Sequence, residues 1–186
     1  EVRWLGFRFE SKKMGQSASK RVFRVLEGSE ELESASNSEY LHCLSLTNHA
    51  FPGVLPYQLF PASERLHLAL TSSATATAAH LLPLISKWAP TPPTRTQVDR
   101  AYRAVARPFV QEQYLEPRQF KAFAVELFAN VVLENAGKAM RRRIPVGVAG
   151  IAGIGWVARS GKATVGAVIG AYVLSVATSI YLGLSG

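Results

Sequence analysis

The sequence predicts an all-α fold, in which a small helical lobe is followed by a C-terminal transmembrane helix or helical hairpin. Two observations carry this prediction. Apolar residues recur at helical spacing through the middle of the chain, with Pro and Gly positions ending the helices. The last third is apolar and has no acidic residue after Glu134. Within it, the uncharged run 163–184 would form a helix of about 33 Å, enough to cross a hydrocarbon core of about 30 Å.

At the N-terminal end, Met14 opens the sequence MGQSASK, which is the pattern for N-myristoylation of Gly15. The modification requires translation to start at Met14, so residues 1–13 are predicted to be a leader or a non-native extension. Residues 14–27 then form a myristoylated basic N-terminus. Because one acyl chain binds membranes weakly, a second signal is expected. The basic residues that would add attraction to anionic lipid are Lys20, Arg21 and Arg24.

Residues 28–90 are predicted to form a first helix-loop-helix region. Glutamates follow Ser29 closely, which favours a helix start because acidic side chains stabilise the positive end of the helix dipole. The Pro52-Gly53 pair ends that helix, and a short apolar segment follows it. The tract 71–79 fits a loop or a weak helix. The predicted helices of this region cover residues 29–48, 63–70 and 80–88.

Residues 91–140 are predicted to form a second helix-loop-helix region, after a stiff Pro-rich linker. Thr96-x-x-Asp99 matches a capping box and would open a helix that runs to about residue 106. A long helix over 119–139 is predicted from apolar residues at helical spacing. These residues are Phe120, Phe123, Leu127 and Val131. The connecting loop 108–119 has 12 residues with Leu115 at its eighth position.

A helix, a 12-residue loop with an apolar eighth residue and a second helix resemble an EF-hand. The order of the chain resembles a plant family of N-myristoylated, membrane-associated EF-hand-like proteins whose function is unsettled. The matching pieces are MGQSASK, PTPPTRTQV, YLEPRQFKAFAVELF and the apolar tail after Arg143. The resemblance implies a paired but degenerate EF-hand-like lobe, in which Leu115 pairs with the other loop.

The second loop departs from the calcium-binding pattern. Calcium loops take oxygen ligands at positions 1, 3, 5 and 9 and a bidentate carboxylate at position 12, with Gly at position 6. In this loop, positions 1, 3 and 5 are Pro108, Val110 and Glu112. Positions 9 and 12 are Glu116 and Gln119, and position 6 is Gln113 instead of Gly. Two carboxylates cannot replace the missing ligands, so we expect no bound calcium. No other metal site or cofactor is predicted.

Residues 141–186 form the predicted Gly-rich membrane anchor. Three basic residues precede it, Arg141, Arg142 and Arg143, and favour a cytosolic position for the preceding lobe. Arg159 and Lys162 interrupt the apolar sequence, so one span, a two-span hairpin and a re-entrant first segment remain alternatives. Gly166 and Gly170 are the predicted helix-packing residues, because small residues let helices approach closely in lipid.

Composition disfavours two classes of function. The formal charge is +8, yet the basic residues border apolar runs without the aromatic interleaving of single-strand-binding proteins, so we expect no nucleic-acid partner. The single cysteine, Cys43, lies beside His42 and seven positions before His49. Because leucines surround it in sequence, it is interpreted as a packed hydrophobe, and an enzyme using Cys43 with a nearby His is the least favoured class.

The sequence therefore predicts a non-catalytic, membrane-tethered interaction module, an adaptor or scaffold with a calcium-independent EF-hand-like lobe. Its expected partners are the lipid bilayer and a protein that the sequence does not identify, with the lobe on the cytosolic side. A homo-oligomer formed through the anchor is a further expectation. The alternative function is a small channel or membrane-remodelling protein built on the Gly-rich hairpin.

Overall fold

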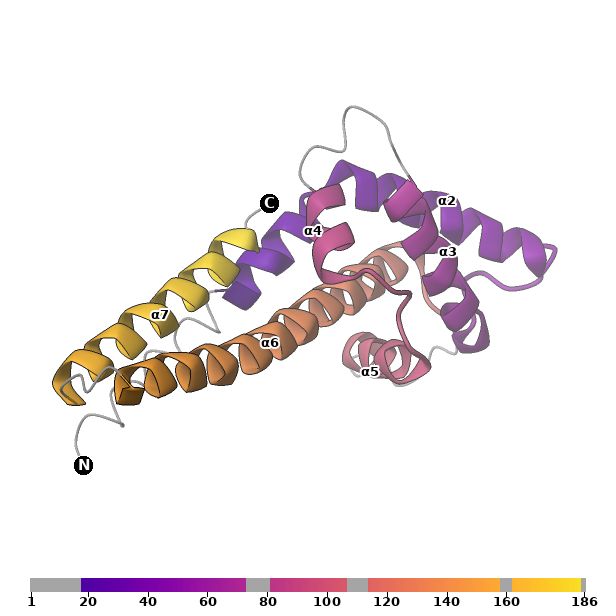
Figure 1. The fold of residues 1–186 in the computed structure, drawn as a ribbon. Helices are drawn as coiled ribbons and strands as arrows, with labels where there is room; N and C mark the ends of the chain where they lie inside the picture. Colours follow the sequence, from indigo (N-terminus) through magenta and orange to yellow (C-terminus); the bar gives the residue numbers. More distant parts are fainter. Residues whose placement is uncertain (1–17, 73–80, 107–113, 158–161, 185–186) are drawn as a thin grey trace.

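The computed structural model describes residues 18–72, 81–106, 114–157 and 162–184 (Figure 1). Throughout these ranges the regular structure is helical, which confirms the predicted all-α class. A helix over residues 18–27 precedes the labelled elements. Those elements are α2 (Glu30–Leu46), the 3-10 helix η1 (Pro56–Gln58), α3 (Leu59–Ser72), α4 (Leu81–Trp88), α5 (Arg95–Ala106), α6 (Pro117–Val157) and α7 (Lys162–Gly183).

Helices α2 to α5 and the first half of α6 form a lobe around one apolar core, and α6 then continues far beyond it (Figure 1). The largest fully buried side chains of the core are Phe120, Phe123 and Phe128, all from α6. The apolar face predicted for residues 119–139 is thus buried as expected. The Phe120 ring also packs against Tyr40 of α2, with 5.8 Å between ring centroids.

Local capping explains where α2 begins and ends. At its start, the Ser29 hydroxyl accepts a hydrogen bond from the Leu32 amide at 3.2 Å, which satisfies one of the unpaired donors of the first turn. At its end, Asn48 and His49 have φ of 50° and 57°, in the left-handed region. The His49 amide then donates back to the Leu44 carbonyl at 3.0 Å, which closes the helix terminus.

A single antiparallel bridge joins the segment before η1 to the segment before α6. The Val54 amide donates to the Leu115 carbonyl at 3.0 Å, and the Leu115 amide donates to the Val54 carbonyl at 2.8 Å. Gly53 makes this approach feasible, because a Cβ atom there would lie only 2.5 Å from the Leu115 carbonyl oxygen. The bridge holds together two segments about 60 residues apart in sequence.

Two predicted helix starts are wrong. Helix α5 begins at Arg95, and its N-terminal cap is Thr94, whose amide donates to Gln97 Oε1 at 2.9 Å. The predicted capping box of Thr96 and Asp99 therefore does not start this helix. Thr94 follows the prolines directly, which puts its amide at the exposed end of the helix. Helix α3 begins at Leu59, ahead of the predicted Ser63, because η1 leads straight into it.

Helix α6 crosses the predicted boundary between the lobe and the anchor without a break. It has 41 residues and contains Pro145, which lacks the amide that would bond to the Arg141 carbonyl. Beyond this proline α6 leaves the lobe, and α7 returns beside it to form a hairpin (Figure 1). The end of α7 lies close to the lobe and to the helix over residues 18–27 (Figure 1).

Candidate membrane interface

The surface of the α6–α7 hairpin is apolar and largely uncovered. Within the described part of the chain, α7 is the one helix long and apolar enough to cross a membrane, over Thr164–Gly183, and 11% of its apolar stretch is buried. Large apolar side chains lie exposed along the hairpin, namely Val146, Val168, Leu174 and Leu182. A soluble core helix of this composition would be mostly buried, so this surface is suited to contact with lipid.

The three predicted basic residues lie where α6 leaves the lobe. Arg141, Arg142 and Arg143 are all exposed, and Arg141 Nε donates to the Gly137 carbonyl at 3.4 Å. Their charges are therefore available to solvent or to lipid headgroups. Glu134, about two turns before them, pairs with Lys138 at 3.2 Å, so α6 carries no carboxylate between this pair and the apolar stretch.

The predicted helix-packing glycines do not form the contact between α6 and α7. No atom lies within 4 Å of the place where a Cβ atom would stand on Gly166 or Gly170. The close approach occurs at Gly147 instead, where a Cβ atom would overlap the ring of Tyr172. The Tyr172 hydroxyl also donates to the Arg143 carbonyl at 3.1 Å. Gly166 and Gly170 are thus left facing open space.

The C-terminal end of α7 is held against the lobe, a feature that the sequence analysis missed. Trp88 Nε1 donates to the Gly183 carbonyl at 3.0 Å, and a Cβ atom on Gly183 would lie 2.8 Å from Lys87 Nζ. Ile180 and Leu184 are buried in the lobe core. The sequence signal was weak, because a Trp at the end of one helix and a Gly near the end of another have no obvious relation.

The basic residues of the N-terminal segment occupy the helix over residues 18–27. Lys20 and Arg24 are exposed, while the Arg21 guanidinium lies 5.2 Å from the ring centroid of Tyr181 in α7. Val22 and Leu26 from the same helix are fully buried. Arg21 is therefore a contact to the anchor rather than a free surface charge. Gly15, the predicted lipidation site, lies outside the described residues.

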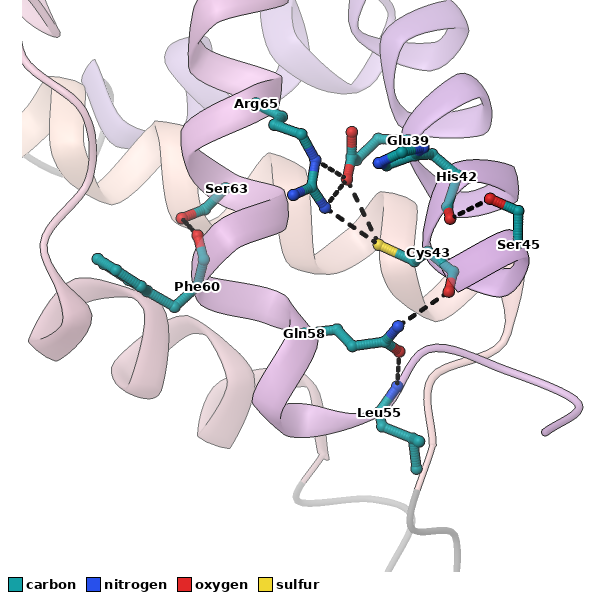
Figure 2. A network of polar contacts seen from close by, with 9 residues as sticks. All are labelled: Glu39, His42, Cys43, Ser45, Leu55, Gln58, Phe60, Ser63 and Arg65. Atoms are coloured by element: carbon teal, nitrogen blue, oxygen red, sulfur yellow. Dashed lines mark hydrogen bonds and ion pairs between the residues drawn. The ribbon is translucent and has the colours of Figure 1, made fainter. Parts of the chain in front are cut away.

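A polar network inside the lobe surrounds Cys43 (Figure 2). Arg65 donates through Nε and Nη2 to Glu39 Oε1, at 2.8 and 2.6 Å, and the Cys43 thiol donates to the same oxygen at 3.4 Å. Gln58 Nε2 donates to the Cys43 carbonyl at 2.8 Å. These contacts fasten α2 to α3 and η1, because Arg65 of α3 and Gln58 of η1 both donate to groups of α2.

The chemistry of this network does not favour a nucleophilic thiol. Burial, followed by the nearby Glu39 carboxylate, raises the pKa of Cys43 to about 12. His42 is exposed on the adjacent position of the helix, so it faces away from the buried thiol, and His49 is also exposed. Among the described residues, no three His, Cys, Asp or Glu side chains come together as a potential metal site.

Two glutamines repeat one arrangement beside the Val54–Leu115 bridge. Gln58 lies four residues after Val54, and its Oε1 accepts from the Leu55 amide at 3.0 Å. Gln119 lies four residues after Leu115, and its Oε1 accepts from the Glu116 amide at 2.8 Å. Each glutamine thus reaches back three residues to cap the helix that follows its segment.

Comparison of the chain with protein-family models, curated proteins and solved structures gave no match.

Proposed function

We propose that this protein is a non-catalytic, membrane-tethered interaction module, an adaptor or scaffold whose lobe lies on the cytosolic side of a membrane. The observation that carries the proposal is the exposed apolar surface of α7 beside a lobe with a complete core. The exposed Arg141–Arg143 cluster at the base of the hairpin supports the cytosolic side, because basic residues flanking membrane segments are retained there.

The lobe is proposed to be a degenerate pair of EF-hands that works without calcium. Its support is the bridge between Val54 and Leu115, each the eighth residue of a 12-residue segment, 47–58 and 108–119. At the last position of each segment, Gln58 and Gln119 use their side-chain oxygens to cap the next helix. A calcium loop needs a bidentate carboxylate at that position, so this architecture replaces a metal ligand by a helix cap.

The surface proposed for a protein partner lies at the end of the lobe that is farthest from the C-terminal end of α6. Leu46, Phe51 and Tyr57, on and after the end of α2, are all exposed to at least 46%. In Figure 1, the C-terminal end of α2 and the C-terminal end of α6 lie at opposite ends of the molecule. An anchored lobe would therefore present these apolar side chains to the cytosol, as an adaptor requires.

The tether is tested by replacing exposed apolar residues of α7 without altering its contacts to the lobe. The double variant Val168→Glu, Leu174→Lys should release the full-length protein from membranes in alkaline carbonate. The matched control is Leu41→Lys, Leu68→Lys, which alters two lobe residues of similar exposure and should remain membrane-bound. Wild-type protein that carbonate extracts, or a control that is released equally, would contradict the tether.

The interaction role is tested on the same membranes by cross-linking. A partner should be captured by wild-type protein and lost in the Leu46→Asp, Tyr57→Asp variant, while Ala104→Asp on the exposed face of α5 should retain it. Ion flux through liposomes containing the purified protein, with no partner dependent on Leu46 or Tyr57, would instead favour the channel alternative.

A further inference from the structure

Most of the exposed residues of α7 form one continuous stripe. Its large members are Val168, Leu174 and Leu182, which are exposed to 49%, 62% and 60%. At about 100° per residue, these three side chains lie within an arc of about 120° around the helix axis. The other exposed positions in the same arc carry small side chains, namely Thr164, Ala167, Ala171, Ser175 and Thr178. The stripe therefore runs along α7 from its first turn to its last.

The opposite face of α7 is covered by the protein itself. Tyr172 lies against Gly147 of α6, and Ile180 and Leu184 belong to the core of the lobe. After Lys162 the helix has no charged residue, so it is apolar on the covered face and on the stripe alike. A helix that is apolar all round is buried on all sides. The stripe therefore needs an apolar cover of its own.

The attachment of α7 to the lobe prevents this helix from crossing a membrane. Its last turn is held by the burial of Ile180 and Leu184 and by the hydrogen bond from Trp88 to the Gly183 carbonyl. The part of α7 before this attachment, residues 164–179, extends about 24 Å, which is less than a hydrocarbon core of about 30 Å. While it is attached, α7 cannot connect the headgroups of the two leaflets.

A hairpin standing upright in one leaflet would leave half of the stripe outside the lipid. The Tyr172 hydroxyl donates to the Arg143 carbonyl, so the exposed cluster Arg141–Arg143 lies level with the middle of α7. From there α7 runs back toward the lobe (Figure 1). With the arginines at the headgroups, Leu182 would stand about 15 Å outside the lipid. All three large side chains reach one depth only if α7 is parallel to the membrane plane.

Basic residues accompany the stripe as well as apolar ones. At its lobe end, the Arg21 guanidinium lies 5.2 Å from the ring centroid of Tyr181. The exposed Lys87 lies beside Gly183, where its Nζ would be 2.8 Å from an added Cβ atom. Leu182 thus has a cation near each of its neighbours in sequence. An apolar stripe accompanied by basic residues suits an anionic lipid surface, whereas a second copy would bring cations of its own to the contact.

We infer that α7 lies in the plane of one leaflet of an anionic membrane, with its stripe in the acyl chains and with α6 and the lobe covering its other face. This inference rests on the proposed membrane tether and specifies its geometry. The stripe then enters about 5–10 Å below the headgroup boundary, as other in-plane helices do. Lipid on one face and protein on the other explain why a helix that does not cross is apolar all round.

The test measures the depth of three positions on the stripe in full-length protein carrying Cys43→Ser. The variants Val168→Cys, Leu174→Cys and Leu182→Cys are each labelled with a nitroxide and bound to phosphatidylcholine–phosphatidylserine vesicles. Electron paramagnetic resonance then compares collisions with oxygen, which concentrates in lipid, and with a water-soluble nickel chelate. The three labels should lie in the acyl chains at one depth, within about 5 Å, or one helix turn. The control Leu41→Cys, on a lobe residue that is 61% exposed, should report water.

Other results overturn the in-plane placement. A helix that crosses or stands upright would spread the labels in depth by about 21 Å between residues 168 and 182. A second copy over the stripe would shield the labels from both collision partners and broaden their spectra until unlabelled protein is added. Labels in water on vesicle-bound protein would assign the membrane contact to another surface.

Flotation of the same samples separates this inference from the tether. Protein that does not float with the vesicles contradicts the tether itself, whereas protein that floats with the wrong depths contradicts only the placement of α7. Omitting phosphatidylserine should lower the floating fraction several-fold, because the basic residues beside the stripe then lose their anionic partners. An unchanged fraction would overturn the assignment to anionic lipid.

Discussion

At the scale of single residues, the lobe contains one polar network whose members depend on one another. Glu39 is 8% exposed and accepts from both Arg65 and the Cys43 thiol. Removing either donor would leave its carboxylate with fewer partners in a poorly solvated place, which is costly. Cys43 is fully buried, as expected for a packed hydrophobe, but no sequence pattern indicated this network. Arg65 is 22 residues from Cys43 and 26 residues from Glu39 in sequence, so no local pattern connects it to them.

The Cys43 thiol should be inert in the folded protein. Its pKa of about 12, against an ordinary value of 9.0, lowers the thiolate fraction at pH 8 about 1,000-fold, and burial blocks access as well. Labelling with a disulfide reagent at pH 8 should therefore require denaturant. The pKa of Cys43 is higher in the folded protein than in the unfolded chain. The contribution of this thiol to the stability of the fold is therefore complete below about pH 9 and declines as pH rises toward 12. Rapid labelling of Cys43 in the native protein at pH 8 would contradict the burial of its thiol beside Glu39.

At the scale of elements, local patterns predicted most of the helices, but not the helix over residues 18–27 and not the joins between helices. The apolar repeat predicted the buried face of α6, because a helix that packs on a core must repeat its apolar residues every three or four positions. The continuation of α6 through Pro145 was not predicted. Nothing local reveals that the apolar residues after it pack beside α7, and that packing compensates for the hydrogen bond that proline cannot make.

The bridge between the two loops should depend on the absence of a side chain at residue 53. Gly53→Ala places a Cβ atom 2.5 Å from the Leu115 oxygen and 2.6 Å from Tyr114 Cδ2, so the segments must separate. We expect a loss of about 1–3 kcal/mol in the free energy of unfolding, as for other overpacked sites. Gly137→Ala is the matched control. Its Cβ atom meets nothing within 4 Å in a helix interior, so it should be neutral or stabilising by up to about 1 kcal/mol. Equal effects of the two variants in urea unfolding would be the contrary result.

The lobe should fold without calcium. Gln119 already uses its side-chain oxygen to cap α6, and Pro108 and Val110 carry no side-chain oxygen. Titration calorimetry of the full-length protein in mild detergent should therefore show no calcium-binding heat up to millimolar concentrations. Gln119→Glu restores the carboxylate of position 12 alone and should remain silent as well, since the other ligands are still missing. A micromolar site in either protein would make the lobe a calcium sensor.

At the scale of the whole molecule, the lobe and the anchor are not separate parts. The sequence predicted a boundary after residue 140 because the basic cluster and the loss of acidic residues mark a change in composition there. In space, α6 runs through that position, and the end of α7 returns to the lobe. The pairing of Trp88 with Gly183 joins residues 95 positions apart, and such contacts follow from the completed fold rather than from any local periodicity.

Shortening α7 should therefore destabilise the lobe as well as the anchor. A chain ending at Ser179 loses two buried side chains, Ile180 and Leu184, and the hydrogen bond to Trp88. These losses amount to about 3–6 kcal/mol if the gap does not close. Hydrogen exchange in detergent should show faster exchange of the α4 amides in the shortened chain. The control is Leu182→Ala, which alters a side chain that is 60% exposed and should leave α4 protected. Unchanged protection of α4 in the chain ending at Ser179 would mean that the anchor contributes nothing to the lobe, and the intramolecular attachment of α7 would have to be abandoned.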